Sequence, residues 1–478
     1  MPERSGAASP NTAGREKELI TMPVTAKINR RRIMQVAGAT TAAMALPPGV
    51  GAAGWRLGSP PAVIVRQADD TPWDEMWQRA AEPYAGATVR VPAGVVEGHF
   101  GASAEAAATF AELTGIESDW ESIPIEQQYQ KIFLDLTSQS GTYDLIPLNY
   151  AWFGAFQSGN HLEPVEQYLN DERFPSVDMS VFIPRLVEVY TMYEGAQYGL
   201  PWLGDAMIFP YNRAHFEEVE LDPNAPPTTW DQVIEFGERL TTGDRYGFAL
   251  MGGRQVQVMC TYAAILFAQD VEFYDAAGRH QFATPQGIAA MQKLANLVPI
   301  SPPAAATWDI VSAAEAVAQG VCSTEIQWPG VLGTLIDPEA PVAGQMAYAP
   351  PPGRGPLGGW GAAISAYSRN KEATWLLINY LTTPRIQKEY AAKGYAITAE
   401  ALFSDPEIQK VYPYAEAAGQ AMASGYPWPR SQESVDVFTI MTEHCNAVVV
   451  GQEEPEAAAR AMDVEVLTLR QERGLITE

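Results

Sequence analysis

Aromatic, amide and cationic side chains follow several apolar stretches of this 478-residue sequence. Asn149, Tyr150 and Trp152 come directly after one such stretch, and the rigid loop at residues 426–430 contains Trp428 and Arg430. Flat aromatic rings bind the C–H faces of sugars and polyols, whereas short carboxylates and amides bind their hydroxyl groups. We therefore interpret these residues as candidates for ligand binding, although the hydrophobic core is an equally good place for Trp152.

Two further candidates are less specific. Glu97 and His99 follow the first predicted strand, where they could face a ligand. Arg430 could meet a ligand hydroxyl, a carboxylate or an internal acid, so its role stays open.

Strands and helices alternate in the first part of the sequence. Residues 86–92 and 143–148 have the pattern of strands, and residues 104–113 and 125–136 have helical spacing, with Gly115 as a C-cap. A short helix is expected around residues 74–81. Because loops at the carboxyl ends of parallel strands bind ligands in open α/β sheets, we place residues 149–156 at such an edge. The alternation predicts parallel sheets covered by helices.

The same alternation begins again after residue 205. Thr229 and Gln232 form a capping-box pattern at the start of a helix, and residues 350–359 are too rich in proline and glycine for any regular element. The other elements expected here are strands at 208–211, 246–250 and 362–366, and helices at 370–381, from 384 to a stop at Gly394, and at 455–473.

Composition and charge exclude several classes of protein. The length suggests two lobes, and 47% hydrophobic with 18% charged residues is typical of a globular chain. The formal net charge of −26 repels phosphate backbones and anionic lipids, so we expect neither a nucleic-acid partner nor a membrane-surface protein.

No pattern indicates a metal or a cofactor. Cys260, Cys322 and Cys445 are far apart in the sequence, and we expect isolated, mostly buried thiols. The alternative that two of them form one disulfide stays open. The five histidines lack ligand spacing. Residues 353–358 match G-x-G-x-x-G, but three prolines precede them and Pro356 stands where a helix should begin, which argues against a dinucleotide site.

The beginning of the chain is typical of an export signal. Arg30 and Arg31 precede a mildly apolar stretch from Ile33 to Leu46, and small residues follow. Paired arginines in this place resemble the twin-arginine signal, with Asn29 and Ile33 as departures from it. We expect a soluble periplasmic protein without a lipid anchor, which starts at Met1 or Met22.

Four segments, in order, resemble the family 1 extracellular solute-binding proteins of ABC transporters, the group of maltose-binding protein. They are Tyr143–Leu145 with Trp152 to Pro164; Tyr198–Pro201 with Tyr211–Arg213 and Pro227–Asp231; Ala314–Gly320 with Ile326–Pro329; and Gly358–Gly361 with Ser368–Ala373 and Leu376–Pro384. The resemblance covers residues 85–478. It implies an α/β, two-lobed periplasmic-binding-protein fold, type II-like, with a hinge and an interlobe cleft.

From the residues themselves, we expect a twin-arginine-type signal at residues 1–53 and a linker at 54–84. The family resemblance then implies the division of the rest of the chain. Residues 85–204 and 358–398 form lobe 1, and residues 205–357 and 399–478 form lobe 2. Hinge crossings are expected near 203–207, in the connector at 350–359 and near 396–400.

The resemblance also implies further ligand-binding residues. Asp205 occupies a position where the family commonly has a ligand-binding acid, and Trp202 flanks the same crossing. Gln327 and Trp328 follow a strand of the second lobe, and Trp360 follows two glycines near the cleft.

The expected function is therefore a non-catalytic, monomeric receptor without cofactors that delivers a sugar or polyol to ABC permease subunits in the membrane. Two alternatives stay open. One is an exported carbohydrate hydrolase with two carboxylates, and the other is a receptor for a different solute, such as an amino acid, a polyamine or glycerol phosphate.

Overall fold

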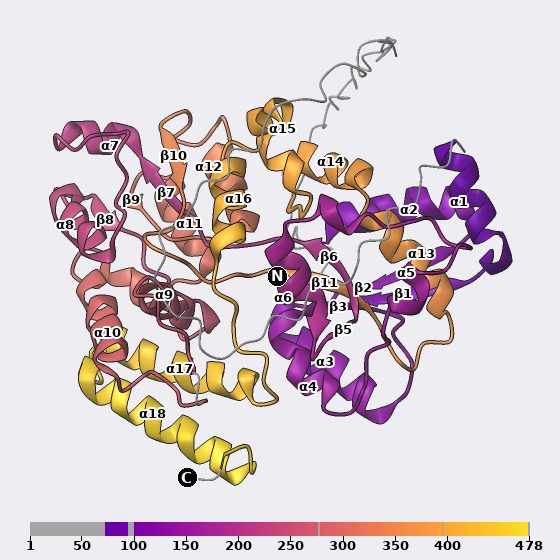
Figure 1. Ribbon diagram of the computed structural model, residues 1–478. Helices are drawn as coiled ribbons and strands as arrows, with labels where there is room; N and C mark the ends of the chain where they lie inside the picture. The colour runs from indigo at the N-terminus through magenta and orange to yellow at the C-terminus, as the bar shows by residue number, and fades with distance from the viewer. Residues whose placement is uncertain (1–71, 94–99, 276–277, 394, 477–478) are drawn as a thin grey trace, which may run out of the picture. The chain divides into compact units, whose positions relative to one another are not determined.

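The computed structural model describes residues 72–93, 100–275, 278–393 and 395–476 (Figure 1). Its strands form two main groups, one on either side of the connection at residues 204–208. The signal motif Arg30–Arg31 and the candidate Glu97 lie outside the described residues.

The first group contains a two-stranded and a three-stranded sheet. β1 (Thr88–Pro92) pairs in parallel with β2 (Glu117–Glu121). β11 (Trp360–Ile364) lies between β3 (Leu145–Asn149) and β6 (Gly199–Leu203) and runs antiparallel to both (Figure 1). The short hairpin of β4 (Met192–Tyr193) and β5 (Ala196–Gln197) stands apart. The expectation of parallel sheets is therefore wrong for the three-stranded sheet, because its central strand comes from a segment far along the chain and not from a single crossover.

The second group is a four-stranded sheet in the order β10-β7-β9-β8. β8 (Tyr246–Phe248) and β9 (Cys322–Thr324) are parallel, whereas β7 (Phe209–Asn212) is antiparallel to β9 and to β10 (Met346–Ala349). The sheet is again mixed and not parallel throughout.

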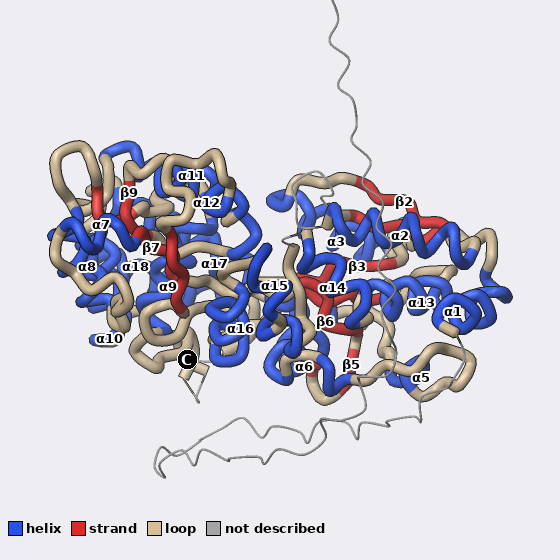
Figure 2. Tube along the Cα trace, turned by 90° about the horizontal axis from the view of Figure 1, so that it is seen from above, coloured by secondary structure: helices blue, strands red, loops and turns tan. Residues whose placement is uncertain are grey.

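Helices surround both groups (Figure 2). In the first part of the chain they are α1 (Trp73–Ala81), α2 (Gly101–Thr114), α3 (Ile125–Ser138), α4 (Phe153–Gln157), α5 (Glu166–Leu169) and α6 (Pro184–Thr191). The middle part has α7 (Arg213–Glu218), α8 (Trp230–Leu240), α9 (Val256–Phe267), α10 (Pro285–Leu297), α11 (Ile310–Ala318) and α12 (Gly333–Ile336). The last part has α13 (Lys371–Leu381), α14 (Pro384–Ala392), α15 (Pro406–Val411), α16 (Ala415–Ser424), α17 (Ser434–Val449) and α18 (Pro455–Glu472).

Two predicted helix boundaries show how local sequence sets the elements. Gly115 ends α2 with a φ of 72°, the left-handed conformation that glycine adopts without strain. At α8, the Thr229 hydroxyl accepts a hydrogen bond from the Gln232 amide (3.2 Å), as the capping box requires. The return bond is shifted by one residue, because the Gln232 side chain accepts from the Thr228 amide (2.8 Å).

The chain segments that join the two groups are hydrogen-bonded to one another. Ala206 forms an antiparallel bridge with Leu357, so the connection at 204–208 lies beside the connector at 350–359. The Leu357 amide in turn donates to the carbonyl oxygen of Tyr426 (2.8 Å). Ala399, in the expected third crossing, forms a bridge with Phe182. The functional candidates Asp205, Trp360 and Trp428 are thus all within a few residues of these joined segments.

Candidate ligand-binding site

Asp205 lies between β6 and β7 and is a buried acid that forms no ion pair with any of the described residues. Its side chain is 5% exposed, and its Oδ1 has no hydrogen-bond partner among the described residues. Burial raises the pKa of this carboxyl group to about 8, and the amide of Ala206 opposes that shift. The group is therefore held where a ligand that donates a hydrogen bond or carries a positive charge would stabilise its ionised form.

Backbone contacts fix Asp205 from two sides. The Gly358 amide donates to the Asp205 carbonyl oxygen (2.9 Å), and the Tyr190 hydroxyl accepts from the Asp205 amide (3.3 Å). A Cβ atom at Gly358 would lie 2.6 Å from Cζ3 of Trp328 and 3.2 Å from Cβ of Asp205. Glycine at position 358 is therefore what allows the Trp328 ring and Asp205 to approach each other.

Two side-chain amides, those of Gln257 and Gln327, hold Trp328 in place. Its indole nitrogen donates to Oε1 of Gln257 (2.9 Å), and its backbone amide donates to Oε1 of Gln327 (2.9 Å). The Gln327 amide group is fully used, since Nε2 donates to the Ile310 carbonyl oxygen and to Glu325 (both 3.0 Å). Gln327 thus orients Trp328 and Glu325.

Glu325 is a second buried acid of this region that the sequence did not reveal. It is 0% exposed, and its Oε1 has no partner among the described residues. Burial raises the pKa of its carboxyl group to about 8, and the hydrogen bond from Gln327 opposes the shift. The available signal was its position directly after β9, two residues before Gln327.

Three tyrosines, two of them buried and one half-buried, form a series of neighbouring rings. The ring centroids of Tyr348 and Tyr414 are 5.3 Å apart, and those of Tyr412 and Tyr414 are 4.1 Å apart. Burial raises the pKa of all three hydroxyls; the charge of Asp205 raises it further at Tyr412 and Tyr414, and that of Glu325 at Tyr348. Sequence reasoning missed all three.

Trp202 and Trp360 belong to an aromatic cluster of the first group of strands. Trp202 is completely buried, and its indole nitrogen donates to the Ser103 hydroxyl (3.1 Å). The Phe100 ring lies between the two tryptophans, with centroid distances of 5.0 Å to Trp202 and 5.7 Å to Trp360. In this conformation the rings pack against one another and do not form an open surface on which a ligand could stack.

Tyr150 and Trp428 connect distant segments. The Tyr150 hydroxyl donates to the Leu357 carbonyl oxygen (2.9 Å) and accepts from the Trp428 amide (3.1 Å). Its ring stacks on that of Tyr190, with centroids 5.3 Å apart. The Trp428 ring packs on Phe273 (5.7 Å). These contacts give both residues a positioning role near Asp205.

Asn149, Trp152 and Arg430 also have defined internal contacts. The Asn149 side chain accepts from the Ala151 amide (3.1 Å) and so caps the turn that follows β3. Trp152 is half-buried against Phe156 (5.8 Å). Arg430 Nη1 donates to the carbonyl oxygens of Glu188, Val189 and Met192, at 3.4, 3.3 and 2.5 Å. In this structure Arg430 thus caps the carboxyl end of α6.

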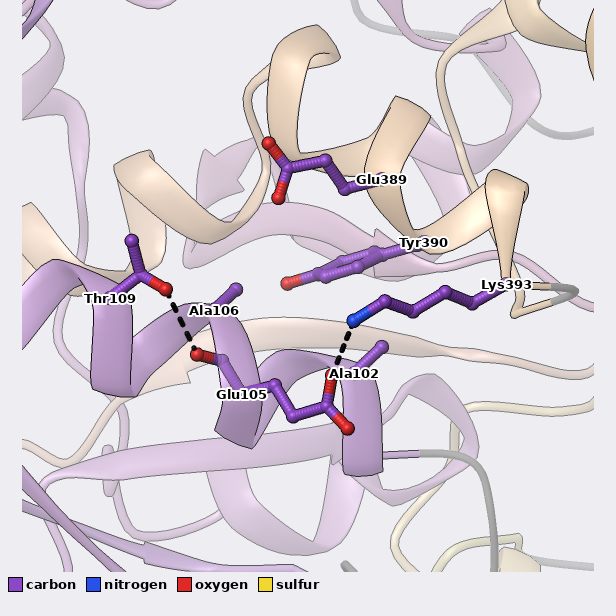
Figure 3. A pocket seen from close by; sticks show the side chains of 7 residues that line it. All are labelled: Ala102, Glu105, Ala106, Thr109, Glu389, Tyr390 and Lys393. Carbon is purple, nitrogen blue, oxygen red and sulfur yellow. Dashed lines mark hydrogen bonds and ion pairs between the residues drawn. The ribbon is translucent and has the colours of Figure 1, made fainter. Parts of the chain in front are cut away.

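A small surface pocket of about 130 Å³ lies elsewhere, between α2 and α14 (Figure 3). The ion pair of Lys393 and Glu105 crosses it, and none of its lining residues is a predicted site residue (Figure 3). Within the described ranges there is no group of His, Cys, Asp and Glu that could hold a metal ion, and the three cysteines are free and buried. Also among these residues, no helix is long and apolar enough to span a bilayer.

Comparisons with known proteins agree with this architecture. A probable amino-acid ABC transporter periplasmic-binding protein of Sinorhizobium fredii is 29% identical over 82% of this chain and 91% of its own length. A solute-binding protein of Agrobacterium radiobacter in complex with ribitol superposes with a TM-score of 0.73 and 22% identity, over 80% of this chain and 99% of the other. A maltose-bound protein of T. maritima gives 0.71 and 21%, over 80% and 100%.

The two-lobed α/β fold that the resemblance implied is thus confirmed. The model of the bacterial extracellular solute-binding proteins matches residues 97–388, more than half of the chain. This protein therefore belongs to the family of bacterial extracellular solute-binding proteins.

Proposed function

We propose that this protein is the exported receptor of an ABC importer and that it binds a sugar or polyol at Asp205. The observation that carries the proposal is the buried Asp205 carboxyl group, which has an unpartnered oxygen and lies close to the Trp328 ring. A hydroxyl group of the solute would satisfy this oxygen, and the aromatic rings would cover its C–H faces.

The names of several relatives support this solute class. A maltotriose-binding protein of Pyrococcus abyssi is 25% identical over 60% of this chain, and an erythritol/L-threitol-binding protein of Mycolicibacterium smegmatis is 21% identical over 63%. The Sinorhizobium relative, in contrast, favours a second candidate, an amino acid. The proposed partner is a membrane permease, and the proposed location is the periplasm.

Binding of the solute would shift the receptor between an open and a closed conformation. The connections at 204–208 and 350–359 lie side by side, so a rotation of one group of strands against the other would act through residues next to Asp205. The expected micromolar affinity corresponds to about 8 kcal/mol. Charge-assisted hydrogen bonds at Asp205 would supply part of it.

The test is a thermal-shift screen of the protein from Gly54 onward against sugars, polyols, amino acids, polyamines and glycerol phosphate. A ligand at about 100 times its Kd adds about 2.7 kcal/mol, which raises the Tm by several degrees. The Asp205→Asn variant should lose this shift, whereas Asp244→Asn, in an exposed turn, should keep it. If amino acids, polyamines or glycerol phosphate raise the Tm and no sugar or polyol does, the proposed solute class is wrong.

A second readout addresses the hydrolase alternative. An oligosaccharide that binds is incubated with the protein and then recovered. A receptor returns the oligosaccharide intact, whereas a hydrolase returns shorter products.

A further inference from the structure

The indole ring of Trp328 extends from a helix to one of the connecting segments. At one end of the ring, Nε1 donates a hydrogen bond to Oε1 of Gln257 on α9 (2.9 Å). At the other end, a Cβ atom at Gly358 would lie 2.6 Å from Cζ3 and 3.1 Å from Cε3. The Gly358 amide is in turn bonded to the carbonyl oxygen of Asp205 (2.9 Å). The ring therefore has α9 on one side and the surroundings of Asp205 on the other.

The backbone of Trp328 is fixed independently of its ring. Its amide donates to Oε1 of Gln327 (2.9 Å), and Gln327 forms an antiparallel bridge with Ile208. Pro329 follows, and a proline restricts the backbone of the residue before it. None of these contacts selects the two side-chain torsions that direct the ring. Because an indole has a single N–H donor, the hydrogen bond to Gln257 is the polar contact that orients it.

Helix α9 is a firm support for this contact. Every residue from Val258 to Phe267 is buried, and the helix packs against α10 and α17 (Figure 1). Gln257 precedes this buried segment by one position and is itself half-buried. Its side chain therefore starts from a backbone position that the packing of α9 holds in place.

We propose that Gln257 is a positioning residue for solute binding: its amide oxygen holds the Trp328 indole in one orientation beside Asp205 before the solute arrives. The inference rests on the proposed function, in which Asp205 binds a hydroxyl group and aromatic rings cover the C–H faces of the solute. A side chain that is already ordered loses less conformational freedom on binding. The hydrogen bond to Gln257 thus raises the affinity without any contact between Gln257 and the solute.

This role sets a requirement on the residue type at position 257. Trp328 is the donor, so the side chain at 257 must supply an acceptor, and its amide nitrogen is not needed. Glutamate keeps an oxygen at the same reach, whereas leucine has a similar helix propensity and no acceptor. The variants Gln257→Glu and Gln257→Leu therefore separate the hydrogen bond from the stability of α9.

The first measurement needs no solute. NMR follows the indole N–H signal of Trp328, which is identified by its absence in the Trp328→Phe variant. We expect this proton to exchange slowly with deuterium in the wild type and in Gln257→Glu, and about tenfold faster or more in Gln257→Leu. An unchanged exchange rate in Gln257→Leu would show that Gln257 does not hold the ring.

The second measurement is the affinity for maltose, maltotriose, ribitol and erythritol by calorimetry. For each solute that binds, Gln257→Leu should weaken binding about fivefold or more, and Gln257→Glu should stay within about twofold of the wild type. In a Trp328→Phe background there is no N–H to hold, so Gln257→Leu should then change the affinity by less than about twofold.

Gln255→Leu is the matched control. Gln255 is exposed, lies two residues before Gln257 and makes no side-chain capping bond to α9, so its substitution should leave both measurements unchanged.

The outcomes keep the two proposals apart. If Asp205→Asn and Trp328→Phe weaken binding but Gln257→Leu does not, the positioning role is wrong and the proposed function stands. If Gln257→Leu weakens binding equally in the Trp328→Phe background, Gln257 acts on the solute directly and the positioning role is again wrong. If binding survives in Asp205→Asn and in Trp328→Phe, the solute lies elsewhere and both proposals fail. If none of the four solutes binds, the proposed solute class is wrong, and the inference fails with it.

Discussion

The amide of Gly358 donates a 2.9 Å hydrogen bond to the carbonyl oxygen of Asp205, and this bond joins two of the segments that connect the strand groups. It brings the connector at 350–359, which has no regular secondary structure, against the acid that the resemblance singled out. Because Trp328 packs over the same glycine, one backbone contact sets the distance between an aromatic ring and a carboxyl group.

The Gly358→Ala substitution should therefore weaken solute binding. Its methyl group would lie 2.6 Å from the Trp328 ring, so the ring or the connector must move. Overpacking of this kind costs about 1–3 kcal/mol, and we expect affinity to fall about tenfold by calorimetry. Gly333→Ala is the control, since a Cβ there meets no atom within 4 Å. Unchanged affinity in Gly358→Ala would place the solute away from Trp328.

Stability should depend on pH through Asp205 and Glu325. Burial raises both pKa values to about 8 from ordinary values of 3.8 and 4.5. Between about pH 4 and pH 8 the folded protein thus binds more protons than the unfolded chain, so the free energy of unfolding falls as the pH rises. The slope is at most about 1.4 kcal/mol per pH unit for each group, and it levels off above about pH 8.

Urea unfolding at several pH values measures this slope. The Asp205→Asn/Glu325→Gln double variant should have a flatter profile and greater stability than the wild type near pH 8, because no buried carboxylate must ionise. Parallel profiles for the two proteins would show that neither acid is protonated in the folded state.

Local elements could be predicted from sequence because local rules determine them. The pattern at 86–92 corresponds to β1 at Thr88–Pro92, and the helix expected at 455–473 corresponds to α18 at Pro455–Glu472. The direction of β11 could not be predicted, since residues 360–364 pair with strands more than 150 residues earlier. Strand order depends on such long-range packing, for which a single sequence carries no local signal.

The candidate site likewise combines residues that the sequence predicts with residues that only the fold brings together. Asp205 and Trp328 are predictions from the resemblance. Glu325 and Tyr348, in contrast, come together through β7: Tyr348 is the strand partner of Pro210, and the Glu325 amide donates to the Pro210 carbonyl oxygen (3.2 Å). Neither residue has a neighbour in sequence that reveals this. Trp202, predicted as a binding residue because it flanks the first expected crossing, is completely buried in this structure. Core and ligand sites use the same aromatic types, so sequence alone does not separate the two roles.

The Tyr150→Phe substitution should destabilise the protein without removing a ligand contact. Phenylalanine keeps the stacking on Tyr190 but leaves the Leu357 carbonyl and the Trp428 amide without their partner. Buried groups left unpaired cost about 1–3 kcal/mol each. Urea unfolding should show this loss, and affinity should stay within about threefold.

A matched variant makes the comparison specific. Tyr246→Phe, at a half-buried position of β8, should change stability by about 0.5 kcal/mol or less. If Tyr150→Phe abolishes solute binding at full stability, the Tyr150 hydroxyl contacts the solute directly, as the sequence suggested.

Substitution of Arg430 tests whether its cation serves the fold or the solute. In Arg430→Gln the carbonyl oxygens of Glu188, Val189 and Met192 lose a charged donor at the end of α6. Hydrogen bonds to charged groups contribute about 1.5–3 kcal/mol, so we expect a loss of that size in the free energy of unfolding. Lysine should restore part of it, since one ammonium group cannot reproduce the planar guanidinium contacts.

The control is Arg460→Gln on α18, where the arginine forms an exposed ion pair with Glu456. Such pairs contribute about 0.3–0.5 kcal/mol, so this variant should unfold almost like the wild type. Solute affinity of folded Arg430→Gln should also remain near that of the wild type, because the guanidinium faces the backbone of α6. A variant that keeps its stability and loses its affinity would reverse this assignment, because the cation would then bind the solute and leave the carbonyl groups of α6 to other donors.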